Sequence, residues 1–520
     1  MKYSSIHNYV YKQPVEKGFY TIEGKTIFFS DDTWNELTDL NVNDLWLTSL
    51  IYLSKDFESD DIDQAYTIYS SWRLRYATPE FRSEKPTSYC WNEISVTARL
   101  FVLSYLYSKK RTDDLYHDIL NHLEWLITKE NYVEKHNHGQ YQDIAIVKFF
   151  NEYSHLFDIE ADYYLTIANK RFTESICHCI SDMGVHLEHS SAYHFTMLKF
   201  IELFLTNSDN HQLSDTRDKM KQIAHLLVYP DGTLPQLGDS YRTAGYQYKA
   251  KKQIFFDKQA GLMIYRSEKW DLFFTCWHHS QTHKQSDELN FELCYKNQRL
   301  FVDSGNYGFD YRNPFNQYAR SLAGHNSLRF PAFEYDTRAE QPYGSGLLLV
   351  SEIKSGVICV GYNPHLLKKD ILHIRILEIN ETSFFVTDYI INDYEEELEV
   401  ETNFHLDESN KIDKVSRNEF IISTKNKKLH MFNGHGSQSV SRYHFDKEKM
   451  KGLYFPEDNT IAGNYQFLLE DKIQGEVSFT SGISEKNTVR KPHYQNGLYQ
   501  SSNRDHTLDI NKLVEEVLSC

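Results

Sequence analysis

The sequence predicts two domains: an N-terminal helical domain over residues 1–250 and a C-terminal antiparallel β-sandwich over residues 251–520. The chain has 520 residues, too many for one core, because single cores stop growing at roughly 250–300 residues. The first half repeats its apolar residues at helical spacing. The second half consists of short β-branched and aromatic runs bounded by turn residues.

The helical half extends from about Asp31 to Tyr229. Apolar side chains three and four residues apart mark the buried face of each helix, as in the run Leu115, Ile119, Leu123 and Leu126. Runs of this kind predict about eight or nine helices joined by short polar links. Helix starts are expected at Ser30–Thr33 and at Leu213–Thr216, where side-chain oxygens can cap the first turn.

The pattern changes after Pro230-Asp-Gly232, and from about Ala260 the apolar runs are short and separated by turn signals such as Asp303-Ser-Gly-Asn306. Strands are expected at Leu272–Cys276, Leu289–Cys294, Leu300–Val302, Phe384–Asp388, Leu398–Phe404, Phe420–Ser423 and Gln466–Leu469. Many short strands with almost no helix between them favour a β-sandwich that begins near residues 240–258.

Composition narrows the range of partners and compartments. The formal net charge of −17 argues against nonspecific binding to nucleic acid or anionic membranes, and no run approaches the ~20 apolar residues of a membrane span. The N-terminus lacks a secretory signal pattern, and seven scattered cysteines argue against a disulfide framework or a cysteine zinc site. As it stands, the chain is predicted to be cytoplasmic, or periplasmic or secreted if a leader has been removed.

Three polar clusters carry the candidate chemistry, and the first is His136-Asn-His-Gly-Gln140, before a predicted helix. Asn137 can cap that helix by accepting a hydrogen bond from a backbone N–H. Its amide can instead donate to a substrate carboxylate, as can a protonated His138. Such donors stabilise the enolate-like charge that forms when the neighbouring proton leaves. The local sequence leaves both alternatives open.

The second cluster runs from Gly184 to His194 and contains Glu188, His189 and Tyr193. In a structural interpretation its two serines cap a helix and Tyr193 packs beneath that helix. In a catalytic interpretation the Tyr193 hydroxyl protonates a leaving glycosidic oxygen, or as phenolate removes the C5 proton of a uronate.

The third cluster opens the β half with His278–His283 and Asp287, continues at Asp303 and ends with His325. Segments rich in His and Asp at the edges of strands are able to bind a metal or to form a general base. A single histidine in a strand is usually packed or solvated, but this repetition favours a functional role.

This third cluster resembles the signature of the heparinase II/III family through His283 with Asp287, Asp303-Ser-Gly305 and His325-Asn326. The second cluster is similar to that family's Glu-x-Ser-x-x-Tyr segment, and Asn137-His-Gly139 is similar to its Asn-His-Gly. Weaker similarities include Trp91-Asn-Glu-Ile-Ser95, Gly238-Asp-Ser240 and Asn403-Phe-His-Leu406. In this order the motifs extend over most of the chain.

The resemblance implies an incomplete (α/α) toroid followed by an antiparallel β-sandwich. It also implies a lyase that cleaves an acidic, uronic-acid-containing polysaccharide or oligosaccharide by β-elimination and leaves a 4,5-unsaturated uronate end. In this scheme Asn137 neutralises the uronate carboxylate with help from His138, and Tyr193 donates the proton to the glycosidic oxygen and is the base in syn elimination. His283 is the base for the opposite C5 epimer or orients the substrate. Substrate contacts are expected from Trp91, Gln140, Glu188, His189, Tyr318 and Arg320.

Several members of that family bind a structural zinc ion through a His two positions after the catalytic one, together with residues that match Asp303 and His325. The position of the second His is Gln285 in this chain, and a neutral amide oxygen is a poor zinc ligand beside imidazole. Asp303 and His325 can instead bond to each other, or His279 can replace the missing ligand. The expected activity requires no cofactor, and Asp303 and His325 are the remaining candidates for a zinc site.

Two alternatives remain open from the sequence. Helical domains of this kind also carry glycoside hydrolases, for which Glu188, Asp239 and Asp287 could supply the pair of carboxylates. The other alternative is a non-catalytic carbohydrate-binding protein of the same fold. Ultraviolet absorbance separates the lyase from the hydrolase, because an unsaturated uronate absorbs and a hydrolysis product does not.

Overall fold

The computed structural model describes residues 19–22, 25–28, 42–58, 60–77, 89–206, 208–249, 252–354, 356–433 and 439–519. The helix start expected at Ser30–Thr33 lies outside these ranges. The chain divides into two compact units: unit 1 comprises Met1–Cys179 and Lys199–Asp215, and unit 2 comprises Ile180–Leu198 and Thr216–Cys520. None of the helices in the described ranges combines the length and apolar character needed to span a membrane.

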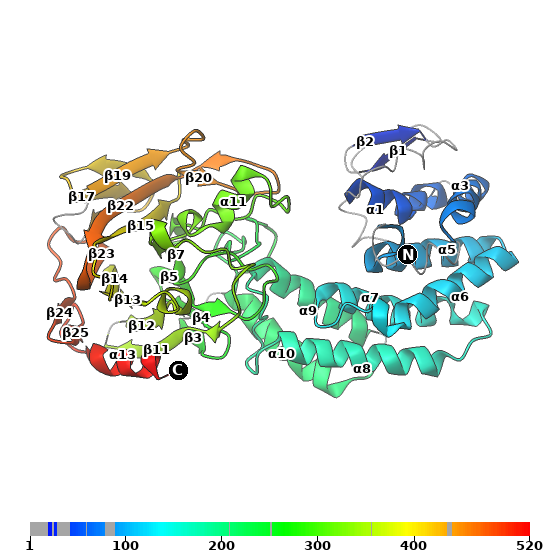
Figure 1. Cartoon of the computed structure of the whole chain (residues 1–520), viewed down its shortest axis with the longest axis horizontal. Helices are drawn as coiled ribbons and strands as arrows, with labels where there is room; N and C mark the ends of the chain where they lie inside the picture. The colour runs from blue at the N-terminus through cyan, green and yellow to red at the C-terminus, as the bar shows by residue number, and fades with distance from the viewer. Residues whose placement is uncertain are drawn as a thin grey trace. The chain divides into compact units, whose positions relative to one another are not determined.

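Unit 1 consists mainly of helices, as the apolar periodicity predicts (Figure 1). They are α1 (Val42–Thr48), α2 (Ser54–Glu58), α3 (Ile62–Tyr76), α5 (Glu93–Lys109), α6 (Asp113–Ile127), α7 (Asn137–Tyr153) and α8 (Ala161–Cys179). A hairpin of β1 (Phe19–Ile22) and β2 (Lys25–Phe28) precedes them, and α9 (Ser191–Leu205) and α10 (His211–Leu226) contribute residues to both units. Side chains cap several of these helices: Asn92, for example, accepts from Ser95 N and Thr112 from Leu115 N.

A buried guanidinium organises part of the core of unit 1. Arg99, on α5, has no exposed surface, and burial lowers its pKa to about 10. Its Nη1 donates to Thr48 O at 2.6 Å, its Nη2 to Cys90 O at 2.8 Å and its Nε to His122 Nε2 at 3.0 Å. The side chain therefore joins three separate segments of the helical array.

Replacing Arg99 with methionine is expected to lower the free energy of unfolding of unit 1 by about 3 kcal/mol, because each buried acceptor left without a donor costs about 1–3 kcal/mol. Chemical denaturation followed by the helical circular dichroism signal measures the change. The control is Arg111→Met, which removes an exposed donor to Leu156 O and should shift the value by less than about 0.5 kcal/mol. Equal stabilities of the two variants would contradict the assignment.

Unit 2 contains two large antiparallel sheets. Within the described residues the first sheet has the order β11-β12-β13-β14-β23-β18-β17-β16, and the second has β19-β22-β15-β8-β7-β5-β4-β3, with β9 also paired to β15. The first comprises β11 (Leu347–Ile353), β12 (Gly356–Tyr362), β13 (Ile371–Ile379), β14 (Ser383–Asn392), β16 (Lys411–Lys414), β17 (Glu419–Ser423), β18 (Lys428–Phe432) and β23 (Gly475–Ser484). The second comprises β3 (Gln253–Asp257), β4 (Leu262–Arg266), β5 (Trp270–Thr275), β7 (Asn290–Tyr295), β8 (Gln298–Phe301), β9 (Leu328–Arg329), β15 (Leu398–Leu406), β19 (Ser439–His444) and β22 (Tyr465–Ile473).

Shorter elements complete unit 2. They are β6 (Trp277–His278), β10 (Gly344–Ser345), α11 (Pro314–Arg320), α12 (Pro364–Leu367), β20 (Leu453–Tyr454), β21 (Ala462–Gly463), β24 (His493–Gln495), β25 (Leu498–Gln500), β26 (Thr507–Asp509) and α13 (Ile510–Leu518). Strand β6 pairs with β10, and β24, β25 and β26 form a small sheet of their own.

The two large sheets share one apolar core. Phe291 and Phe404 of the second sheet lie in the same buried cluster as Leu377 and Phe384 of the first, and the rings of Phe291 and Phe384 are 5.2 Å apart. Every strand that the sequence predicts overlaps one of the observed strands, which are β5, β7, β8, β14, β15, β17 and β22, and the predicted ends differ by at most one residue where they extend beyond them. The predicted fold class, a helical region followed by antiparallel sheets, is confirmed.

Strands β12 and β13 lie outside the predicted set, because they are buried on both faces and lack an alternation of apolar and polar residues. Along β12, Val357 and Cys359 join the core between the sheets, while Ile358 and Val360 face a second cluster. The second cluster also contains Leu513 of α13, the C-terminal helix, which Figure 1 shows beside β11.

The predicted boundary at residue 250 separates helices from strands, whereas the compact units divide the chain differently. Ile180–Leu198 and the segment after Thr216 belong to unit 2. Their apolar side chains, including Val185 and Leu227, form one buried cluster with Leu262 of the second sheet. Packing on the sheet therefore places the second polar cluster of the sequence in the same unit as the third.

Candidate active site

Three segments of unit 2 meet through their main chains at residues 186–194, 236–240 and 278–288. Asp239 N donates to His283 O at 3.3 Å. A Cβ atom on Gly238, which has a φ of +53°, would lie 2.4 Å from His189 O and 2.8 Å from His283 O. Only glycine allows so close an approach of the three segments.

His189 holds the loop that carries His283. Its Nε2 accepts from His279 N at 2.8 Å, so the ring proton is on Nδ1, which donates to Thr282 O at 3.1 Å. Burial depresses the pKa of His189 far below its usual value, which keeps the ring neutral. The prediction that His189 contacts substrate is corrected: its side chain is completely buried, and it positions a neighbouring loop.

The backbone of this region is in an unusual conformation. His189 and His283 have φ values of 64° and 55°, in the left-handed region that costs a non-glycine residue of order 1–3 kcal/mol. The hydrogen bonds of His189 and the close contacts of Gly238 hold this conformation in place. Such strain is concentrated at functional sites, where it fixes the direction of a side chain.

Tyr193 and His283 are in direct contact. Their ring centroids are 3.4 Å apart and their planes are inclined by 19°. Tyr193 lies on the first turn of α9, where Ser190 Oγ accepts from Tyr193 N at 3.2 Å. Tyr193 is half-buried, and the His283 side chain is 11% exposed. The structural and the catalytic interpretations of this segment are therefore compatible. Ser190 caps the helix, and the cap fixes the first turn that presents Tyr193 to His283.

A buried carboxylate lies behind His283. Asp239 Oδ2 is 3.4 Å from His283 Nδ1, and Asp239 Oδ1 accepts from Arg320 Nη1 at 2.5 Å and from Gln285 Nε2 at 2.9 Å. Burial alone would raise the pKa of Asp239, but Arg320 and the bonds from His283 and Gln285 hold it below its usual value. Sequence reasoning did not assign this role to Asp239, although the weak Gly238-Asp-Ser240 similarity marks its position.

This arrangement leaves His283 Nε2 as the atom able to take a proton. Nε2 is buried and makes no hydrogen bond to any residue that the structure describes. It lies 3.6 Å from Glu188 Oε2, which is also 3.7 Å from His186 Nε2. Burial depresses the pKa of His186 far below its usual value, so this second imidazole is neutral. Glu188, predicted to contact substrate, therefore lies beside the reactive nitrogen.

Tyr318 and Arg320 have structural partners within unit 2, and their role in lining substrate subsites stays a prediction. Both are 7% exposed. The Tyr318 hydroxyl donates to Gln466 Oε1 at 3.3 Å. Arg320 bonds to Asp239 and, through Nη2, to the backbone oxygen of Lys284. Its guanidinium is therefore engaged in holding the carboxylate behind His283.

Two predicted substrate contacts in unit 1 also prove to be core residues. Gln140 is fully buried, and its Nε2 donates to Ser175 Oγ at 3.0 Å. Trp91 is 5% exposed, donates from Nε1 to Tyr76 O at 2.7 Å, and lies 5.2 Å below the Arg99 guanidinium. Both side chains are enclosed by packing, which corrects the prediction that they contact substrate.

Asn137 and His138 occupy the first turn of α7 in unit 1. The helix cap is His136, whose Nδ1 accepts from His138 N at 3.2 Å, so Asn137 is not the cap. Asn137 Oδ1 is buried and has no hydrogen-bond partner among the described residues. His138 Nδ1 lies 2.7 Å from Glu93 Oε1. Burial alone would raise the pKa of Glu93, but the bond from His138 keeps it below its usual value.

The residues that the family resemblance implies for zinc fit the ion poorly. His325 Nδ1 donates to Asp303 Oδ2 at 2.6 Å, as the sequence allowed, and Asn290 Nδ2 donates to the same oxygen at 2.7 Å. Gln285 is bonded to Asp239, and His279 Nε2 bonds to Ala260 O. His325 Nδ1 is occupied by Asp303, whereas His325 Nε2 is buried without a hydrogen-bond partner among the described residues. Burial alone would lower the pKa of His325, but Asp303 raises it above its usual value, which favours an imidazolium over a metal ligand.

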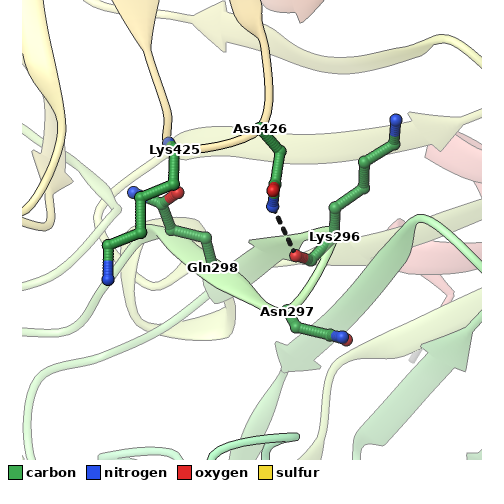
Figure 2. Close-up of a pocket in the computed structure, with 5 residues that line it drawn as sticks. All are labelled: Lys296, Asn297, Gln298, Lys425 and Asn426. Atoms are coloured by element: carbon green, nitrogen blue, oxygen red, sulfur yellow. Dashed lines mark hydrogen bonds between the residues drawn. The ribbon is translucent and has the colours of Figure 1, made fainter.

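The hollow drawn in Figure 2 contains none of the candidate residues. It has a volume of about 620 Å³ and is lined by Lys296, Asn297, Gln298, Lys425 and Asn426. Asn426 Nδ2 donates to Lys296 O at 3.0 Å, which joins the turn after β7 to the turn after β17 (Figure 2). Its lining offers no acid–base pair, so it is a surface hollow between two hairpin turns.

Comparison with known proteins identifies relatives of the fold. Residues 250–464 match the family model described as "Heparinase II/III-like, C-terminal". A solved structure of heparinase III aligns with a TM-score of 0.66 at 15% identity, covering 86% of this chain and 81% of that one. A mutant of heparan sulfate lyase HepC from Pedobacter heparinus aligns with a TM-score of 0.65 at 15% identity, covering 96% and 90%. Comparison with curated proteins finds no match.

Proposed function

The chain carries a heparinase II/III-like C-terminal domain after an N-terminal helical region, and from this premise we propose that it cleaves a uronic-acid-containing polysaccharide or oligosaccharide by β-elimination. The observation that carries the proposal is the contact of Tyr193 with His283, with Asp239 behind the imidazole. Two groups able to transfer protons thus lie side by side, and one of them is oriented by a carboxylate.

In the proposed reaction a base removes the C5 proton of the uronate, and the released electron pair forms the C4–C5 double bond. The bond between C4 and the glycosidic oxygen breaks, and that oxygen receives a proton. Tyr193 is the proposed donor, and in syn elimination its phenolate is also the base. His283, through Nε2, is the proposed base for the opposite C5 epimer. Asp239 keeps His283 in the orientation that leaves Nε2 available.

Removal of the C5 proton develops negative charge on the uronate carboxylate, which requires hydrogen-bond donors. The family resemblance assigns this role to Asn137 and His138 of unit 1. Asn137 would donate through Nδ2, since its buried Oδ1 is an acceptor, which has no hydrogen-bond partner among the described residues. Glu93 occupies His138 Nδ1 at 2.7 Å, which leaves Nε2 of that ring to face a ligand.

The same geometry argues against the alternative of a glycoside hydrolase that uses a pair of carboxylates. Asp239 is engaged by Arg320, and Asp287 forms a buried ion pair with Lys284. Both carboxylates are 2% exposed or less, so neither is placed to protonate a glycosidic oxygen or to activate water. Glu188 alone remains, whereas hydrolysis of this type needs two carboxyl groups flanking the bond.

A panel of uronate polymers tests the proposal, and heparan sulfate is its first member because one structural relative is a heparan sulfate lyase. The expected result is rising ultraviolet absorbance from the unsaturated product with at least one polymer. New reducing ends without this absorbance would favour hydrolysis. Binding without any product would favour the non-catalytic alternative, and either outcome overturns the lyase proposal.

A further inference from the structure

We propose that His278, Glu288 and His365 form a binding site for one divalent transition metal ion, with zinc as the first candidate. The three side chains come from β6, from the loop before β7 and from α12. Among the described residues they form the one group of three metal-binding side chains whose ligand atoms all lie within 4.8 Å of one another. Each is 1% exposed or less. The site is separate from Asp303 and His325, the positions that the family resemblance implies.

The spacing of the donor atoms suits a tetrahedral ion. His278 Nδ1 is 2.9 Å from His365 Nε2, and His365 Nε2 is 3.7 Å from Glu288 Oε1. Donors about 2.0–2.2 Å from a tetrahedral zinc ion lie roughly 3.3–3.5 Å from one another, and the two observed distances fall on either side of that range. Small rotations of the rings would equalise them, and two His with one carboxylate is a common zinc donor set.

The contact between the two imidazoles shows that a ring nitrogen is available for a metal. His278 Nδ1 and His365 Nε2 are 2.9 Å apart, so one of them donates and the other accepts with its lone pair. The short contact between their nitrogens accounts for one ring proton in the metal-free protein. When a metal ion binds, that proton moves to the other nitrogen of the same ring, which changes the tautomer and leaves the charge of the ring unchanged.

Groups around the three ligands support the same assignment. His365 Nδ1 is buried without a hydrogen-bond partner among the described residues and lies 3.8 Å from Glu340 Oε2. A small rotation of the ring would bring the two atoms into the hydrogen bond by which a carboxylate orients a metal-bound imidazole. Glu288 Oε2 accepts from the Tyr335 hydroxyl at 2.6 Å, and Oε1 faces both Lys284 Nζ at 2.8 Å and His365 Nε2 at 3.7 Å. Asn363 Nδ2 donates to the same hydroxyl at 3.1 Å. Outer contacts of this kind are typical of metal sites.

The charged groups around the site carry a net negative charge, which a bound cation would balance. Lys284 is fully buried and contacts both Asp287 and Glu288, so one ammonium faces two carboxyl groups. The nearby Arg375 does not compensate for the difference, because it is paired with Asp388. Lys284 also donates to Gln285 O at 2.6 Å, and with a metal bound it would keep Asp287 and this carbonyl as partners. A buried net negative charge is unfavourable and is relieved by a bound cation.

The test uses the full-length protein, stripped with a chelator, dialysed and then incubated with Zn²⁺. The expected wild-type content is about one equivalent after removal of free metal, falling below about 0.1 equivalent in His365→Ala and Glu288→Gln. Co²⁺ in place of Zn²⁺ should give the visible absorption of a tetrahedral site. Glu340→Gln, which alters a partly exposed residue, should bind about 10–100-fold more weakly while remaining folded.

The matched control is His325→Ala, which removes a buried histidine from the Asp303 pair and should retain the equivalent of zinc. A wild-type protein that binds no metal overturns the inference. So does a loss of zinc in His325→Ala with retention in His365→Ala, because the ion would then lie at Asp303 and His325. Metal content is independent of the lyase reaction, so this result and the polymer panel can fail separately.

Discussion

Tyr193→Phe is expected to lower kcat/KM for β-elimination by about 10²–10⁴-fold, the contribution of a positioned acid or base to such a reaction. The variant removes one hydroxyl and keeps the ring that packs on His283 at 3.4 Å, so folding should be unchanged. Initial rates of ultraviolet absorbance on the best polymer of the panel measure the effect. Because binding groups are untouched, the loss should appear in kcat more than in KM.

The control is Tyr394→Phe, which removes an exposed hydroxyl that donates to Lys369 O at 3.0 Å. Its rate should equal that of the wild type. A Tyr193→Phe enzyme with more than about a tenth of wild-type activity would show that another group protonates the glycosidic oxygen. The Tyr193 assignment would then fail, while the lyase activity itself would stand.

Asp239→Asn is expected to lower both stability and activity. The neutral amide leaves the buried Arg320 guanidinium without its charged partner, which costs about 3–5 kcal/mol in the free energy of unfolding. The amide keeps one oxygen for Arg320 and Gln285, so its NH2 replaces the Oδ2 that faces His283 Nδ1. A misplacement of about 1 Å in a reacting group costs roughly 10²-fold in rate. Denaturation and initial rates measure the two effects on the same preparation.

The difference in stability between the wild type and Asp239→Asn should become smaller at acidic pH. The pKa of Asp239 is lower in the folded protein than its usual value, so its ion pair contributes stability that is fully present above the unfolded pKa of about 3.9. This contribution is lost as the pH falls toward the folded pKa. The gap between wild type and Asp239→Asn should therefore narrow below about pH 4 and stay constant near pH 7.

Asp218→Asn is the matched control, because Asp218 also pairs with an arginine, Arg217 at 2.8 Å, but is 60% exposed. An exposed pair is worth about 0–1 kcal/mol, so this variant should match the wild type in stability and rate. Equal behaviour of Asp218→Asn and Asp239→Asn would refute the positioning role of Asp239.

Several parts of the site follow from the sequence because their signals are local. The Asn-His-Gly at residue 137, the serine and tyrosine at 190–193 and the His283 segment are each readable within about ten residues. The structure places Tyr193 against His283 as neighbours. The substrate roles predicted for His189 and Gln140 are wrong, because residue type alone does not tell an exposed polar side chain from a fully buried one with bonded partners.

The sequence by itself determined the helical first half and the stranded second half, since periods of 3.6 and 2 reflect which side chains face a core. It could not define the unit boundary, because Ile180–Leu198 joins unit 2 only by packing on the sheet. Tertiary structure alone placed Asp239 behind His283, and brought together His278, Glu288 and His365 from separate segments. Such convergence depends on strand order and loop paths, which are set by contacts between residues far apart in the chain.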